Sequence, residues 1–128
     1  MELYIGGFAQ GKLNCVLKDN SDAIVIDENN FDEICDFDNT VIWNHFHLSV
    51  KKLLNEGVTS KDILQRVNEL SNKVSKLIII SDEIGNGIVP IDAFERMYRE
   101  ETGRLLIEIA AAAEKVVRIS CGIAQTIK

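Results

Sequence analysis

The sequence predicts an α/β fold in which helices cover both faces of a mainly parallel sheet of about five strands. Two continuous apolar, β-branched runs, at 23–26 and 77–80, are typical of strands buried on both faces, as in parallel sheets. Between them, apolar side chains recur at the spacing of an amphipathic helix. These are Ile63, Val67, Leu70 and Val74. Strands that alternate with helices predict right-handed crossovers and three layers.

Each expected element has its own local signal. Apolar runs predict strands at Glu2–Ile5, Ala23–Ile26, Thr40–Trp43, Leu77–Ile80 and Val116–Ile119. Capping residues and helical spacing predict helices at Gly11–Lys18, at His47–Asn55, after Thr59-Ser60 and at Asp92–Ala113. The last helix has a weak point at Thr102-Gly103, because glycine disfavours a helix interior.

The loops that follow the strands are the expected place for functional residues. Parallel strands end at one edge of a sheet, and ligands bind at that edge. The loops concerned are Gly6–Lys12, Asn44–His47, Asp82–Pro90 and Cys121–Gln125.

Composition limits the possible functions. With 128 residues, 46% of them apolar, the chain fits one domain, residues 1–128, that can bury a substantial core. A net charge of −6 argues against general binding to nucleic acid or to an anionic membrane, because both need a basic field. No apolar run reaches membrane-spanning length and no secretory signal is visible. Cysteines without a C-x-x-C pair are typical of free thiols, so a cytoplasmic location is expected.

A glycine-rich segment between the first strand and the first helix carries the strongest functional signal. Its spacing is G-x-x-x-x-G-K, the pattern of a loop whose backbone N–H groups surround nucleotide phosphates while the lysine neutralises their charge. The expected nucleotide-binding residues are Gly6, Gly7, Phe8, Ala9, Gln10, Gly11, Lys12 and Leu13. Leu13 stands where this pattern usually has a Ser or Thr hydroxyl that binds magnesium. The alternative is a glycine-rich turn with a solvated lysine.

Three further side chains follow expected strands. Glu83, directly after the strongest strand, could orient a nucleophile, accept its proton or hold magnesium through water. A turn acid that solvates its loop is an equally good interpretation from spacing alone. His45 and His47 follow the third strand and could act as a nucleophile or base. We favour ordinary polar residues at a helix start, because no acidic or Cys partner is spaced to complete a metal site.

Together these segments resemble a known family. The stretch from Gly6 to Lys12 resembles the G-G-x-x-S-G-K-S loop of the bifunctional adenosylcobinamide kinase/adenosylcobinamide-phosphate guanylyltransferases of cobalamin biosynthesis. Leu77–Pro90 resembles that family's apolar strand followed by N-E-V-G-x-G-I-V-P. Arg96-Met97-Tyr98-Arg99-Glu100, with Gly103-Arg104-Leu105, resembles its R-x-F-R-D…G-x-L helix.

The resemblance implies a P-loop NTPase-like three-layer fold and a homotrimer. Members phosphorylate adenosylcobinamide with ATP or GTP, and then transfer GMP from GTP through a guanylylated histidine. For this chain it implies a purine nucleotide, ATP or GTP, with magnesium held by the nucleotide, and an adenosylcobinamide-like corrinoid as acceptor. Lys12 and Glu83 are the catalytic residues that it suggests.

The sequence also departs from the family pattern. Leu13 replaces the magnesium-binding hydroxyl, and Asn44 replaces the aspartate of the V-L-V-D strand. An alternative register pairs Asp38 and Trp43 with the family's D-x-x-x-x-W, but it disrupts the strand. The arginine-rich segment that holds the family's guanylylated histidine has no counterpart between the second and third expected strands, and neither His45 nor His47 matches that histidine. Kinase activity is therefore expected more than guanylyl transfer. The rival hypothesis is a catalytically silent relative that binds nucleotide or corrinoid, or that serves as an assembly subunit.

Overall fold

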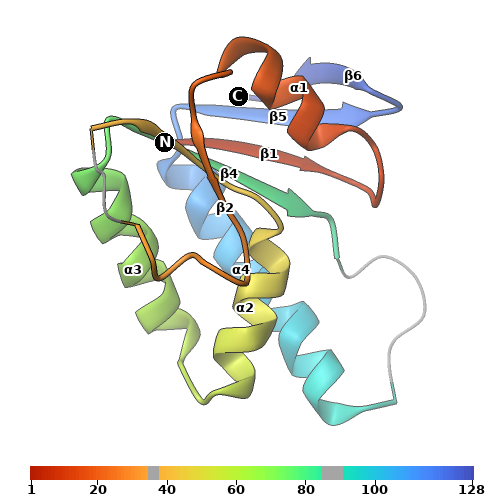
Figure 1. Cartoon of the computed structure of the whole chain (residues 1–128). Coiled ribbons are helices and arrows are strands. Elements are labelled where there is room, and N and C mark those ends of the chain that lie inside the picture. Colours follow the sequence, from red (N-terminus) through yellow and green to blue (C-terminus); the bar gives the residue numbers. More distant parts are fainter. Residues whose placement is uncertain (35–37, 85–90) are drawn as a thin grey trace.

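The fold is built on a six-stranded sheet with the strand order β2-β3-β4-β1-β5-β6 (Figure 1). The structure is a computed structural model, and it describes residues 1–34, 38–84 and 91–128. The strands are β1 (Glu2–Gly6), β2 (Ile24–Ile26), β3 (Thr40–Trp43), β4 (Lys76–Asp82), β5 (Lys115–Ser120) and β6 (Ile123–Thr126). The helices are α1 (Lys12–Asp19), α2 (Phe46–Asn55), α3 (Ser60–Lys73) and α4 (Ala93–Ala112). Strands β1 to β5 are parallel to one another, and β6 pairs antiparallel with β5.

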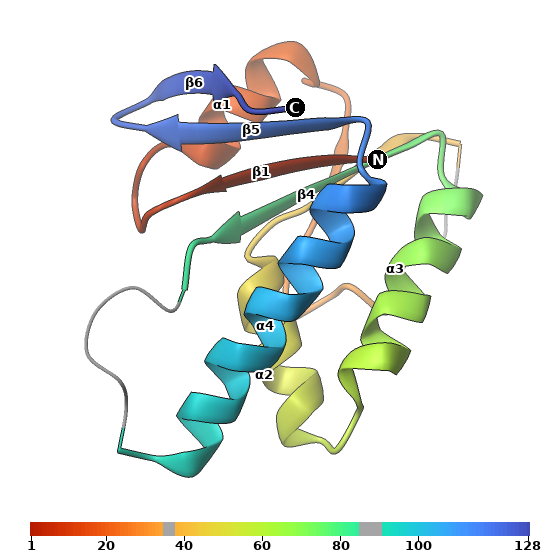
Figure 2. The same ribbon diagram turned by 180° about the vertical axis from the view of Figure 1, so that it is seen from behind.

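Helices cover the sheet on both sides, as the sequence predicts (Figures 1 and 2). On one side, Val16 of α1 packs with Ile78 and Ile80 of β4. On the other side, α2, α3 and α4 pack against the alternate residues Leu77 and Ile79. Successive strand residues point to opposite faces, so a strand between two helical layers must be apolar at every position. The three-layer prediction is confirmed.

The sheet has one more strand than the sequence predicts. Cys121 (φ 53°) and Gly122 (φ 74°) form a two-residue connection with positive φ at both positions, which is the geometry that joins antiparallel strands. Strand β6 follows and pairs Ile123 with Ser120. All its residues are exposed, so no alternation of buried and exposed side chains marks it in the sequence.

Helix α4 is continuous, as the sequence predicts: it runs through Thr102 and Gly103 without a break, and Asp92 caps it by accepting a hydrogen bond from the Glu95 N–H at 3.1 Å. Strand β4 continues past Ile80 to Asp82, where the sequence suggests a loop. This extension places a carboxylate at the edge of the sheet at which the site lies.

Within the described ranges, no helix combines the length and the apolarity that crossing a bilayer would require.

Candidate functional site

The carboxyl ends of the parallel strands lie at one edge of the sheet (Figure 1). A cavity of about 300 Å³ opens there. Two of the expected loops line it: the glycine-rich loop after β1, and the segment that begins after β3. The end of β4 supplies a third side. The lining residues are Phe8, Ala9, Gln10, Gly11, Lys12, Leu13, Asn14, Asn44, His45 and Asp82. Residues 85–90 of the third expected loop lie outside the described residues.

The glycine-rich loop is held in place by its own backbone and by the turn between β5 and β6. A Cβ atom on Gly6 would lie 2.4 Å from the Ile119 carbonyl oxygen, so only glycine fits at this position. The Cys121 N–H donates to Gln10 Oε1 at 2.6 Å, and the Gly122 N–H donates to the Gln10 carbonyl oxygen at 3.0 Å. The expected loop at Cys121–Gln125 therefore contacts the glycine-rich loop, but its role is to support the residues that line the cavity.

Lys12 is the first residue of α1, and its ammonium group is turned back toward the loop. The side chain is only 7% exposed. Its Nζ donates to the Gly7 carbonyl oxygen at 2.6 Å and lies 2.7 Å from Asp82 Oδ1. A buried ammonium group needs such partners, because the loss of its hydration is otherwise costly. Gly11, with φ at 81°, gives the backbone the left-handed turn that begins this helix.

Asp82 is the functional residue that the sequence reasoning missed. Because side chains alternate along a strand, Asp82 points to the same face as Ile78 and Ile80, which is the face covered by α1. The sequence predicts a strand that ends at Ile80 and points to the neighbouring Glu83 as the site residue. The alternation of side chains along a strand could have identified Asp82, because a strand extended by two residues places it beside the glycine-rich loop.

Glu83 lies on the opposite side of the sheet from Lys12. Its Oε2 accepts a hydrogen bond from Arg118 Nη2 at 2.8 Å. Both residues line a separate cavity of about 410 Å³ beside α4, together with Leu3, Ile5 and other apolar side chains. The Glu83 N–H donates to the Gly6 carbonyl oxygen at 2.8 Å and joins the ends of β4 and β1. The structure thus brings the Glu83 backbone to the loop and keeps its carboxylate away from Lys12.

His47, in the first turn of α2, contacts Asp82 with both ring nitrogens. Its Nδ1 accepts the Asp82 N–H at 3.1 Å, and its Nε2 lies 3.4 Å from Asp82 Oδ2. Burial lowers the pKa of His47 below its usual 6.5, although the Asp82 charge opposes this shift. In a neutral ring whose Nδ1 accepts, the proton is assigned to Nε2, facing the carboxylate. His47 therefore fixes the orientation of Asp82.

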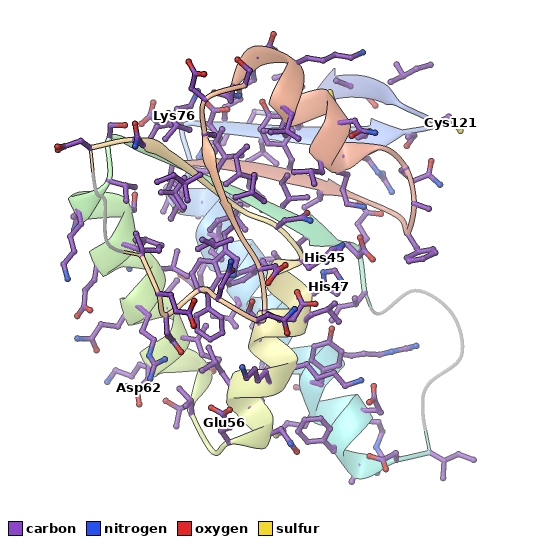
Figure 3. The ribbon with its side chains drawn as sticks, viewed as in Figure 1. His45, His47, Glu56, Asp62, Lys76 and Cys121 are labelled. Carbon is purple, nitrogen blue, oxygen red and sulfur yellow. The ribbon has the colours of Figure 1, made fainter. Side chains whose placement is uncertain are left out.

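His45 lies beside His47, at the end of β3 and the start of α2 (Figure 3). The two ring centroids are 5.9 Å apart. His45 has a left-handed backbone (φ 52°), is about half exposed, and lines the cavity. Its Nδ1 lies 3.7 Å from Glu28 Oε2. Of the two histidines, His45 is the accessible one and His47 is nearly buried.

The cavity offers few oxygen ligands for a magnesium ion. Asp82 supplies one carboxylate and Asn44 one amide oxygen, while Leu13 supplies none. Over the part of the chain that the structure describes, no group of three or more His, Cys, Asp or Glu side chains is arranged to hold a metal. Magnesium usually keeps several waters and binds through one or two carboxylates together with substrate phosphates. The residues present fit that mode, with the nucleotide as the main ligand.

Comparisons with known proteins identify the family of the chain. The family model of cobinamide kinase / cobinamide phosphate guanyltransferase matches residues 11–127. Two curated relatives, the bifunctional adenosylcobalamin biosynthesis proteins CobU of Salmonella typhimurium and Escherichia coli, are each 37% identical over 54 residues. Each match covers 42% of this chain and 30% of the relative. The aligned part is thus less than a third of the curated proteins.

Proposed function

The chain belongs to the cobinamide kinase / cobinamide phosphate guanyltransferase family, and we propose that it binds ATP or GTP and phosphorylates a cobinamide. The observation that carries this proposal is the Lys12 ammonium, buried between the glycine-rich loop and the end of β4 on the wall of a cavity. An ammonium in this position is suited to neutralise a phosphate. The other expected residues of the glycine-rich loop contribute their backbone around the Lys12 ammonium.

Phosphate binding has three contributors in this arrangement. Phe8–Leu13 line the cavity and would offer backbone N–H groups to a phosphate, and the start of α1 places the positive end of the helix dipole there. Lys12 adds a full positive charge. Phosphoryl transfer depends mainly on positioning and charge neutralisation, and magnesium carried with the nucleotide supplies part of the latter.

Kinase activity is favoured over guanylyl transfer. A guanylylated histidine must reach the α-phosphate of GTP with a free ring nitrogen. His47 is only 6% exposed, and both its nitrogens face Asp82. His45 is accessible but lies opposite Glu28. Neither residue matches the family's histidine. Glu83 remains our candidate for the acceptor side, where it borders the second cavity with Arg118.

A catalytically silent relative is the second candidate, and one specific observation favours it. Leu13 and Asn44 both line the cavity at positions where the family resemblance calls for magnesium-binding oxygen groups. Such a protein would bind nucleotide or corrinoid without turnover, or would serve as an assembly subunit. A cytoplasmic location and a homotrimer belong to both candidates.

Incubation with labelled ATP or GTP, adenosylcobinamide and magnesium separates the two candidates. Label transferred to the corrinoid supports the kinase, whereas nucleotide binding without transfer supports the silent relative. Acid-labile label on the protein itself would instead indicate guanylylation, and His45→Ala and His47→Ala would show which ring carries it. The Lys12→Met variant is the control, because it keeps the aliphatic stem and removes the charge.

A further inference from the structure

We infer that Asp82 makes nucleotide binding in this cavity depend on a divalent cation. The inference rests on the proposed function and assigns the cation dependence to one carboxylate. Before nucleotide binds, Lys12 Nζ is shared between Asp82 Oδ1 at 2.7 Å and the Gly7 carbonyl oxygen at 2.6 Å. A phosphate that contacts this nitrogen must therefore displace Asp82 or lie directly beside it.

Asp82 cannot easily turn away from an arriving phosphate. Its side chain is largely buried, its N–H donates to His47 Nδ1, and its Oδ2 lies 3.4 Å from His47 Nε2. These contacts keep the carboxylate at the wall of the cavity. A nucleotide without a metal thus meets a fixed negative charge. That charge also offsets part of the attraction between Lys12 and the phosphates.

A divalent cation removes both penalties. With the cation between Asp82 and the phosphates, the carboxylate becomes a ligand in place of a repelling neighbour, and Lys12 becomes free to contact phosphate. Asp82 is the only acidic side chain among the described residues that line the cavity. Asn44, which also lines it, can add an amide oxygen but no charge. The cation dependence should therefore reside in Asp82.

The sequence of the two neighbouring strand ends supports this assignment. The segment that resembles V-L-V-D ends here in Asn44, and the segment that resembles N-E-V-G begins here with Asp82. The carboxylate and the amide are thus exchanged between β3 and β4, which are paired in the sheet. One negative charge is kept at the cavity, but it has moved to the strand next to β1.

The test compares nucleotide affinity with and without magnesium. Calorimetric titration of ATP, and separately of GTP, is carried out in magnesium chloride and in EDTA on the wild-type chain, Asp82→Asn and Asp22→Asn. Asp22→Asn is the matched control, because it makes the same charge change at an exposed residue that precedes β2 and does not line the cavity. We expect affinity in EDTA to be weaker by about tenfold or more in the wild type and in Asp22→Asn. In Asp82→Asn the ratio of the Kd in EDTA to the Kd in magnesium should fall toward one, mainly because binding in EDTA becomes tighter.

A double variant tests whether the effect of Asp82→Asn comes from the lost charge or from misfolding. Asn44→Asp combined with Asp82→Asn returns the charge to β3, and we expect it to regain the wild-type ratio. Equal ratios in Asp82→Asn and Asp22→Asn, or a double variant as cation-independent as Asp82→Asn, would overturn the inference while leaving the proposed function intact. If neither ATP nor GTP binds the wild-type chain in magnesium, the proposed function fails, and the inference fails with it.

Discussion

The Lys12 ammonium lies 2.7 Å from the Asp82 carboxylate, which joins the start of α1 to the end of β4. Both side chains are largely buried. The contact links the glycine-rich loop to the neighbouring strand, and under the proposed function it is the charge pair that an incoming phosphate alters.

Breaking this pair from one side should cost stability. Removal of one partner of a buried ion pair leaves an uncompensated charge. We expect Lys12→Met to lower the free energy of unfolding by about 3 kcal/mol, and the double variant Lys12→Met/Asp82→Asn to recover most of that loss. Urea denaturation of the two single variants and the double variant measures the coupling. Additive effects would show that the pair contributes nothing.

Gly6 should not tolerate a side chain. A Cβ atom there would lie 2.4 Å from the Ile119 carbonyl oxygen, and a backbone atom cannot yield as a flexible side chain can. We expect Gly6→Ala to destabilise the fold by about 1–3 kcal/mol and to weaken nucleotide binding. Gly103→Ala is the matched control, because nothing lies within 4 Å of its added Cβ and it is in the interior of α4. It should stabilise the protein by up to about 1 kcal/mol. Equal effects of the two changes would contradict the packing around Gly6.

Gln10 should couple the cavity to the β5–β6 turn. Its side chain accepts the Cys121 N–H, and Gln10→Ala removes this bond. We expect a loss of about 1 kcal/mol in unfolding free energy, together with weaker nucleotide binding because the loop is less fixed. Gln125→Ala, on the exposed strand β6, should change neither quantity. If Gln10→Ala binds nucleotide as tightly as the wild type, the turn does not support the loop.

The free energy of unfolding should fall as the pH decreases, because His47 binds a proton more readily in the unfolded chain. Burial lowers the pKa of His47 in the folded state below its usual 6.5, so the unfolded chain binds more protons in this range. The contribution is therefore fully present above about pH 6.5 and is lost as the pH falls from there toward the lowered folded pKa. Urea midpoints between pH 7.5 and 5.5 should decline less in His47→Asn than in the wild type. His45→Asn should keep the wild-type decline, and a matching decline in His47→Asn would exclude His47 as the cause.

The sequence predicts the position of the glycine-rich loop better than the side chains and strands that lie around it. The G-x-x-x-x-G-K spacing is local, so Gly6–Leu13 could be identified without knowledge of the fold. Asp82 could not be found in the same way, because its side-chain direction depends on how far β4 extends. The continuation of that strand is fixed by its pairing with β1, where Gly6 pairs with Asp82. Strand β6 escaped prediction because its residues are exposed and carry no alternating pattern.

The two histidines illustrate the same limit. Their spacing does not distinguish a buried ring from an exposed one. His45 caps α2 with a left-handed backbone, α2 begins at the next residue, Phe46, and His47 in its first turn contacts Asp82. That outcome depends on a backbone conformation which non-glycine residues adopt only occasionally.

Thermal unfolding with ATP or GTP, in magnesium and in EDTA, shows whether this cavity binds a nucleotide. We expect one of the two nucleotides with magnesium, at about a hundred times its Kd, to raise the apparent stability by about 2.7 kcal/mol. The same nucleotide in EDTA should give a smaller increase, and Lys12→Met should give none. An unfolding temperature that saturating ATP and GTP both leave unchanged would contradict the claim that this cavity binds a nucleotide.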